Sequence, residues 1–341
     1  MKRKRFLTSI VTAAIALPAA KAFAAIPDME SASTFKIPSV LQPGDQIGIS
    51  SPAGYISLED IQPAVLQMQS WGFNIEIGET IGKRDFTYGG TDQERLADFQ
   101  AMLDHPKIKA IMCARGGYGL VRIIDQLDFT IFKKHPKWII GFSDITVLHC
   151  HLAKQFGIAS IHSKMCNSFP SDWSKAEPIQ IETILSIKDA LSGQNMRYVA
   201  AANTQNRFGK AEGLLVGGNL SLIETLAGSA SDLDTTNRIL FIEDTGEYLY
   251  RIDRMLWNLK RSGKLSKLKG LLVGGFKVKP DDPGEEFGKT VTEIVLEKVR
   301  EYDYPVAFDF PVGHQRNNFA FKCGVKHALE VHEGGTILRT S

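Results

Sequence analysis

The chain has 341 residues, of which 43% are hydrophobic and 23% charged, with 40 basic and 38 acidic side chains. This composition is typical of a folded globular protein long enough for two domains, and it excludes disordered and fibrous chains. The near balance of charge offers no electrostatic basis for binding nucleic acid, so we expect no nucleic-acid partner.

Residues 1–24 have the pattern of a secretory signal peptide. Four basic residues at 2–5 precede an apolar stretch at 6–20, and Ala22-Phe23-Ala24 places small residues at the cleavage positions. The stretch is short for a membrane span, so we expect no stable span after cleavage, the alternative being an uncleaved N-terminal anchor. Cleavage removes five of the 40 basic side chains and leaves 35 against 38 acidic ones, a charge of about −3.

Short strand patterns alternate with amphipathic helical patterns in the first half of the chain. The expected strands are 46–50, 74–77, 109–114 and 138–140, and the expected helices are 58–71, 91–104 and two that follow residues 119 and 143. Thr91 and Glu94 form a capping box that opens the second helix. This alternation predicts a parallel sheet with sites at the carboxyl ends of its strands, where the loops 115–119 and 141–143 fall.

The second half of the chain predicts another α/β domain. Gly-Leu-Leu-Val-Gly-Gly occurs at 213–218 and again at 270–275, each time as a buried strand whose glycines allow a tight turn or a close approach. Further expected elements are a helix at 179–191, a strand at 238–242, an acidic turn at 243–247, helices at 250–261 and 290–302, a strand at 306–310, and terminal strands near 321 and 328–331.

These patterns predict an α/β fold in two domains. We expect a flavodoxin-like parallel-sheet domain at 35–170, a connecting segment at 171–208 and a smaller α/β domain at 209–341. The four cysteines have neither C-x-x-C spacing nor a metal-site pattern. Cys113 and Cys150 lie in apolar patterns, so we expect buried free thiols and no metal.

Ser143 interrupts the apolar run 137–149, and two interpretations compete. Its hydroxyl could cap the helix that follows, or it could be a nucleophile exposed at the end of a strand. A serine nucleophile needs a base and an orienting carboxylate. Of eight histidines, His314 on a glycine-hinged loop and His162 after a strand-like run are the candidates. The spacing does not choose among the acids Glu243, Asp244 and Glu247.

The glycine-rich loops are weak evidence for a bound nucleotide. The loop 115–119 lacks the lysine of a phosphate-binding loop and the spaced glycines of a dinucleotide site. Backbone amides of such a loop can instead form an oxyanion hole.

Seven short motifs, taken in order, carry a resemblance to a known family. They are Ser-Pro-Ala-Gly at 51–54, Tyr-Gly-Gly-Thr-Asp at 88–92, Arg-Gly-Gly-Tyr-Gly at 115–119, Gly-Phe-Ser-Asp at 141–144, Gly-Gly-Asn-Leu at 217–220, Ile-Glu-Asp at 242–244 and Gly-His at 313–314. Their order and approximate spacing over residues 37–335 resemble the LD-carboxypeptidase family of serine peptidases. Each motif is weak alone, but seven in order are specific.

The resemblance implies a role for each of several residues. Ser143 would be the nucleophile, His314 the base and Glu243 the orienting carboxylate. The backbone amides of Gly117 and Asp144 would form the oxyanion hole. The expected substrate-binding residues are Arg115, Gly116 and His162. Ile145 stands where the nucleophile elbow of α/β-hydrolases has a glycine, so similar geometry would arise on a different fold.

The implied reaction is hydrolysis of the bond between an L-centre and the terminal D-alanine of murein tetrapeptides, with an acyl-enzyme and without cofactor or metal. Members of the family commonly form homodimers. The family's murein-recycling members act in the cytoplasm, whereas the leader pattern predicts that this chain is periplasmic. Export disfavours the family's other activity, self-immunity against a peptidyl-nucleotide antibiotic. A periplasmic solute-binding protein, with Arg115 holding a ligand carboxylate, is the alternative from another class.

Overall fold

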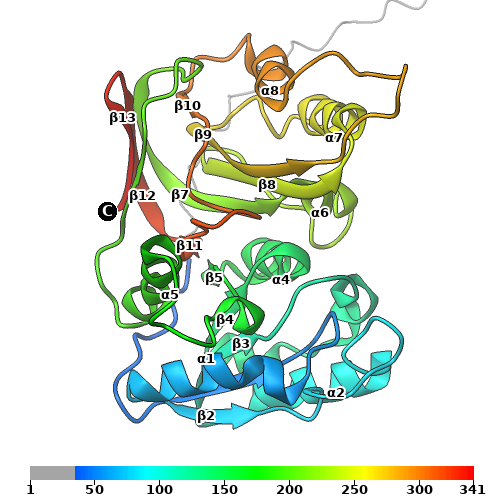
Figure 1. Ribbon diagram of the computed structural model, residues 1–341, viewed down its shortest axis with the longest axis vertical. Helices are drawn as coiled ribbons and strands as arrows, with labels where there is room; N and C mark the ends of the chain where they lie inside the picture. Colours follow the sequence, from blue (N-terminus) through cyan, green and yellow to red (C-terminus); the bar gives the residue numbers. More distant parts are fainter. Residues whose placement is uncertain (1–34) are drawn as a thin grey trace, which may run out of the picture. The chain divides into compact units, whose positions relative to one another are not determined.

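Two β-sheets organise the residues that the computed structural model describes, 35–341 (Figure 1). The predicted signal peptide lies outside these described residues. Within residues 35–341, no helix has the length and apolar character needed to cross a lipid bilayer.

The first sheet has the order β11-β5-β4-β3-β1-β2. Its parallel strands are β1 (Gln46–Ser50), β2 (Asn74–Ile77), β3 (Ile108–Cys113), β4 (Trp138–Gly141) and β5 (Ser160–His162). The order 2-1-3-4-5 is that of flavodoxin-like folds, so the predicted fold class is confirmed. In such a sheet a ligand site lies beyond the carboxyl ends of the strands.

Helices α1 (Leu58–Ser70), α2 (Asp92–Asp104), α3 (Thr130–Lys134) and α4 (Thr146–His151) connect these strands. The predicted capping box opens α2: the Thr91 hydroxyl accepts from the Glu94 backbone N–H, and the Glu94 carboxylate accepts from the Thr91 N–H. The helix expected after residue 119 is instead two 3-10 turns, Leu120–Arg122 and Ile124–Gln126. That stretch is therefore closer to a loop than the sequence predicts.

The second sheet has the order β10-β9-β8-β7-β12-β13-β6. Its strands are β6 (Arg197–Ala200), β7 (Gly209–Asn219), β8 (Ile239–Glu247), β9 (Gly270–Val278), β10 (Val306–Ala307), β12 (Lys326–His332) and β13 (Gly335–Thr340). Pairing is parallel from β10 to β7 and antiparallel from β7 to β6. The associated helices are α5 (Pro178–Leu191), α6 (Leu220–Thr225), α7 (Leu249–Arg261) and α8 (Val291–Val299).

Two predicted elements of this half are wrong in detail. The acidic segment 243–247 is not a turn but the end of β8, where it pairs with β9 across two register shifts. The strand expected at 306–310 is only two residues long, because Asp309 has a left-handed φ of +53° that interrupts the extended backbone.

Each sheet contains one strand from an unexpected part of the chain. Strand β11 (Phe321–Cys323), from the far end of the sequence, pairs antiparallel with β5 of the first sheet, Phe321 facing His162. Strand β6 of the second sheet comes from the predicted connecting segment. The domain boundaries stay a prediction, but the sequence predicted neither of these two pairings.

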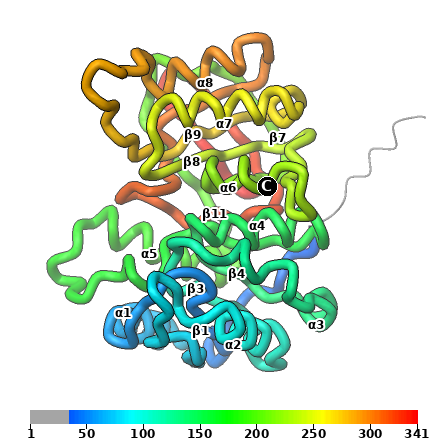
Figure 2. Tube along the Cα trace, turned by 90° about the vertical axis from the view of Figure 1, so that its right-hand side faces the viewer, coloured from blue at the N-terminus to red at the C-terminus, as the bar shows by residue number. Residues whose placement is uncertain are grey.

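Helix α4 lies between the sheets, beside α6 (Figures 1 and 2). One hydrophobic cluster continues from Val147 and Leu148 of α4 to Val216 of β7 and Ile223 of α6. The paired glycines of the repeat mark close approaches and not turns: a Cβ on Gly218 would lie 2.6 Å from the Thr146 hydroxyl. All four cysteines are buried and free, as predicted.

Candidate active site

Ser143 follows β4 in a strained backbone conformation. Its φ is +62°, a left-handed value that costs a non-glycine residue about 1 kcal/mol or more. Neither the turn Ser143–Ile145 nor α4 has a side-chain cap, so the capping interpretation of Ser143 is wrong. Backbone strain of this kind is concentrated at functional sites, where the surrounding structure holds it in place.

The glycine loop 115–119 packs directly on the Ser143 side chain. A Cβ added to Gly116 would lie 2.9 Å from the Ser143 Cβ and 3.1 Å from its Oγ, so only glycine lets the loop come this close. On its other side, the Gly116 carbonyl accepts a 2.9 Å hydrogen bond from the Gly54 N–H. The loop that follows β3 thus lies against the serine that follows β4, as their places at neighbouring strand ends predict.

The side chain of Asp144 ties the serine turn to the end of this loop. It is buried, and its Oδ2 accepts a 2.9 Å hydrogen bond from the Leu120 N–H. Burial raises the pKa of Asp144 to about 6, because the ionised form is poorly solvated there. The carboxylate is therefore structural, and the oxyanion role expected for the amides of Asp144 and Gly117 stays a prediction.

Arg95 of α2 holds the surrounding loops together, a role that no motif in the sequence predicts. Its side chain is fully buried and donates to the carbonyls of Pro52 at 2.7 Å, Gly119 at 3.0 Å and Gly90 at 3.3 Å. It also pairs with the Asp92 carboxylate, to which Arg122 adds a second ion pair at 2.6 Å. An arginine within an amphipathic helix pattern normally faces solvent, so its neighbours along the chain give no signal of this role.

His314 and Glu243 form the central polar pair of the site. The His314 Nδ1 and the Glu243 Oε2 are 2.6 Å apart, and the Glu243 side chain is completely buried. Gly313 has φ +101°, and a Cβ there would lie 2.3 Å from the Glu243 Cβ. The Gly313 N–H donates to the Asn318 Oδ1 at 2.8 Å, which fixes the loop. Glycine before His314 is thus required for the pair to form.

The other two acids of the segment have different partners. Asp244 accepts hydrogen bonds from the Asn219 amide and the Ser221 backbone N–H, at the start of α6. Burial raises the pKa of Asp244 to about 6. Glu247 forms a 2.8 Å ion pair with Arg251. Among the three acids, Glu243 is the one that contacts His314, and its role as the orienting carboxylate stays a prediction.

Phe142 connects the histidine to the serine turn. Its ring centroid lies 4.9 Å from that of His314, and it directly precedes Ser143. The same phenylalanine packs edge-on against His162 at 5.8 Å. The Phe142 ring thus links the turn of Ser143 to His314, which in turn contacts Glu243.

The expected substrate-binding residues differ in their accessibility. His162 has no exposed surface, so direct contact with a substrate, as we expected, is incompatible with its position beneath Phe142 and Phe241. Arg115 is exposed, and one guanidinium N–H donates to the Tyr55 carbonyl at 2.9 Å. Gly116 borders Ser143 as described. The roles of Arg115 and Gly116 stay predictions.

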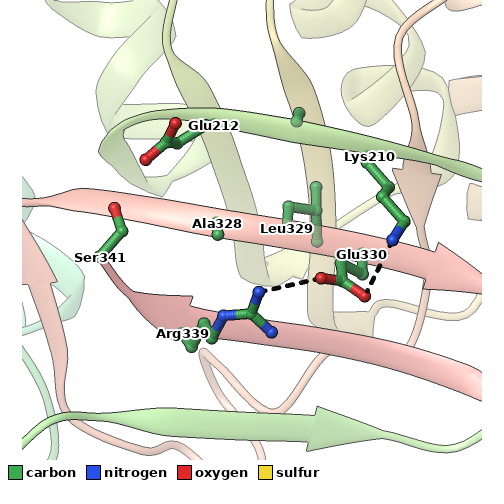
Figure 3. A pocket seen from close by; sticks show the side chains of 8 residues that line it. Lys210, Glu212, Ala328, Leu329, Glu330, Arg339 and Ser341 are labelled. Atoms are coloured by element: carbon green, nitrogen blue, oxygen red, sulfur yellow. Dashed lines mark hydrogen bonds and ion pairs between the residues drawn. The ribbon is translucent and has the colours of Figure 1, made fainter.

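A hollow on the antiparallel part of the second sheet contains none of these residues. There Glu330 of β12 pairs with both Lys210 and Arg339 from the neighbouring strands (Figure 3). The opposite charges satisfy one another across the sheet, which is the arrangement of a solvated sheet face. In residues 35–341 no three His, Cys, Asp or Glu side chains are grouped so as to hold a metal ion.

Comparison with known proteins gives the family. The family model for the LD-carboxypeptidase N-terminal domain matches residues 47–163, and that for the C-terminal domain matches residues 212–329. The chain belongs to the LD-carboxypeptidase family. Membership confirms the resemblance of the seven motifs and makes the chain a peptidase of the carboxypeptidase type.

The sequences of known relatives align with nearly the whole chain. A probable murein peptide carboxypeptidase of Bacillus subtilis is 32% identical, covering 88% of this chain and 93% of its own length. The murein tetrapeptide carboxypeptidase of Pseudomonas aeruginosa is 28% identical, covering 85% and 94%.

Two solved structures have the same fold as this chain. The muramoyltetrapeptide carboxypeptidase of Oxalobacter formigenes superposes with a TM-score of 0.75 at 28% identity, covering 87% of this chain and 98% of its own. The microcin C7 self-immunity protein MccF gives a TM-score of 0.77 at 24% identity, covering 89% and 98%. At that identity MccF shows the shared fold alone.

Proposed function

We propose that this protein is a serine LD-carboxypeptidase that removes the terminal D-alanine from murein tetrapeptides. The observation that carries the proposal is the hydrogen-bonded pair of His314 and Glu243, which packs through Phe142 against the turn of Ser143. A strained serine, a partly exposed histidine and a buried carboxylate are the parts of a nucleophilic triad. Names of the relatives from B. subtilis and P. aeruginosa support a murein peptide as the substrate.

Each residue of the triad has a definite task in this mechanism. Glu243 accepts a hydrogen bond from the His314 Nδ1, which leaves Nε2 free to take the Ser143 proton. The Ser143 Oγ attacks the scissile carbonyl carbon, the peptide C–N bond breaks, and His314 protonates the leaving D-alanine amine. The result is an ester between Ser143 and the shortened peptide.

Water completes the cycle. His314 takes a proton from water, the hydroxide attacks the ester carbonyl, and the proton returns to the Ser143 Oγ. Backbone amides of Gly117 and Asp144 would stabilise the oxyanion that forms in both steps, a contribution of about 3 kcal/mol per donor in other acyl-transfer enzymes. The strained φ of Ser143 presents its hydroxyl at the edge of the sheet, beside the glycine loop.

Digestion of a murein tetrapeptide tests the proposal. Wild-type protein should release one alanine, seen as the corresponding mass loss, and Ser143→Ala should lower the rate by at least about 10³-fold. Unchanged thermal unfolding of the variant would show that the fold is intact. Binding of the peptide without turnover by the wild-type protein would contradict the proposal and support a solute-binding protein instead.

We also propose that the protein acts after export, in the periplasm. The proposal rests on the basic, apolar and small-residue pattern of residues 1–24. Fractionation of the producing cells should recover a chain shortened by about 24 residues in the periplasmic fraction. Recovery of the full-length chain in the cytosol would refute export and leave the proposed activity untouched.

A further inference from the structure

The register of β4 and β5 places Lys164 beside Ser143, the proposed nucleophile. Gly141 at the end of β4 pairs with His162 at the end of the parallel strand β5. Ser143 and Lys164 each follow two residues later, and the Ser163 N–H donates to the Gly141 carbonyl at 3.1 Å. Neighbouring strands are about 4.8 Å apart, so the two residues leave the same edge of the sheet side by side.

The Lys164 side chain points toward the histidine loop. Its Nζ donates a 2.7 Å hydrogen bond to the carbonyl of Gln315, the residue after His314, and lies 5.9 Å from the Phe142 ring centroid. The ammonium group thus sits next to two structures that flank the reacting atoms: the loop of the base and the ring before the nucleophile.

The charge of Lys164 has no counterion among residues 35–341. No carboxylate of this part of the chain lies within 4.0 Å of its Nζ, and only one of its three N–H donors has a protein partner. Burial and the nearby charge of Lys277 lower the pKa of Lys164 to about 8, although Glu243 acts in the opposite direction. The residue is therefore mainly protonated at neutral pH and poorly solvated, so an arriving anion would interact strongly with it.

A carboxypeptidase substrate supplies such an anion at a fixed place. In a terminal residue the carboxylate is separated from the scissile nitrogen by one Cα, so it lies within about 4 Å of the scissile bond. A cation that recognises it must therefore be a close neighbour of the nucleophile. Lys164 meets this requirement, whereas the exposed guanidinium of Arg115 is bonded to the Tyr55 carbonyl.

We propose that Lys164 binds the C-terminal carboxylate of the peptide and so restricts the enzyme to cleavage of the last residue. This inference rests on the proposed carboxypeptidase function. The hydrogen bond to the Gln315 carbonyl would orient the ammonium group, while its remaining N–H donors would face the carboxylate. Lys164 would thus be a specificity-determining residue of the leaving-group side of the site.

The test compares a murein tetrapeptide with the same peptide whose terminal carboxyl group is amidated. Wild-type protein should cleave the acid with a kcat/KM at least about 30-fold above that of the amide, the size expected for loss of a buried charge pair. Lys164→Met should remove this preference by lowering kcat/KM for the acid and leaving that for the amide nearly unchanged. Lys164→Arg should retain part of the preference.

One control variant and the outcomes of the main comparison separate the possible failures. Lys277→Met removes an exposed positive charge nearby, and an equal loss of preference there would overturn a specific contact. Equal losses on acid and amide in Lys164→Met would show that the lysine only anchors the His314 loop, which also overturns the inference. If wild-type protein cleaves both peptides equally, the inference fails while the proposed function stands; if it cleaves neither, the proposed function itself fails.

Discussion

The carboxylate of Glu243 is completely buried and reaches His314 with one oxygen. A buried carboxylate with one charged partner is most stable when that partner is positive, and the imidazole becomes positive when it takes the serine proton. At the scale of single residues, Glu243 is thus placed to stabilise the positive imidazole that forms during the proposed reaction.

Replacing Glu243 tests this electrostatic role. Glu243→Gln keeps the size of the side chain but removes its charge, so kcat should fall by about 10²- to 10⁴-fold on a murein tetrapeptide. Asp244→Asn is the matched control, because Asp244 contacts Asn219 and Ser221 and not the histidine. Normal turnover in Glu243→Gln together with inactivity of Asp244→Asn would reverse the assignment of the orienting acid.

Gly116 offers a second test at a single residue. Its φ lies outside the left-handed region, so alanine is allowed by the backbone, yet the added methyl would lie 2.9 Å from the Ser143 Cβ. We expect Gly116→Ala to lower kcat/KM by at least about tenfold, because a displacement near 1 Å of a catalytic group has effects of that order. Gly334→Ala in the hairpin of β12 and β13 should leave the rate unchanged, and equal rates in both variants would contradict the close-contact role.

At the scale of elements, helix α2 serves the site through Arg95. Its capping box fixes where the helix begins, and this start places Arg95 one turn later beneath the loops at 52, 90 and 119. The helix therefore acts as a support for three loops.

Arg95→Met should destabilise the protein by about 2–4 kcal/mol, because several buried carbonyls lose their donor. Activity should fall as well, since the Gly119 carbonyl is part of the glycine loop. Arg122→Met removes the other arginine that pairs with Asp92, but its side chain is 45% exposed, so we expect a much smaller loss of stability than in Arg95→Met. Denaturant unfolding of the two variants measures the difference, and similar losses would refute the supporting role of Arg95.

Local patterns predicted the elements that local interactions determine. The strands β1 and β2 have the predicted bounds, and the α2 capping box lies where Thr91 and Glu94 indicate. Strand β6 was missed, because its pairing with β13 connects residues about 140 positions apart and leaves no periodicity at this short edge. The 243–247 segment was predicted as a turn because its acids are polar, but tertiary pairing with β9 extends the strand.

Sequence motifs predicted some residues of the candidate site, but not which side chains around them are buried. The motifs that resemble the LD-carboxypeptidase family include Ser143, Glu243 and His314, and the structure brings the last two into contact. Burial is set by packing between distant segments, so neither the enclosure of His162 nor the buried position of Arg95 follows from the sequence around them.

At the scale of the whole molecule, the shifted pKa values of buried groups should determine how the free energy of unfolding changes at acid pH. Burial lowers the pKa of His149 and His327 to about 4. It also lowers the pKa values of His151 and His162. Between about pH 6.5 and 4 the unfolded chain binds protons that the folded histidines do not, so these four destabilise the fold as pH falls. The raised pKa values of Asp144 and Asp244 act in the opposite direction, but they are only two groups.

The free energy of unfolding should therefore decrease from pH 6.5 to 4.5, and His327→Gln should flatten the decrease. A histidine whose pKa falls from 6.5 to about 4 accounts for about 2 kcal/mol of lost stability by pH 5. His332→Gln, on the same strand but exposed, should not change the slope. Denaturant titrations across this pH range measure both slopes, and parallel curves for the wild-type protein and His327→Gln would contradict the prediction.

The pairing of β11 with β5 also constrains when the enzyme becomes competent during its synthesis. The ribosome makes β5 roughly 160 residues before β11, a delay of about 10–30 s at ordinary translation rates. Until then the edge of β5 lacks its neighbour and is open to aberrant pairing. In the proposed mechanism, Ser143 likewise lacks its base until His314 on this late segment has been made, so a chain that ends before residue 314 should have no peptidase activity.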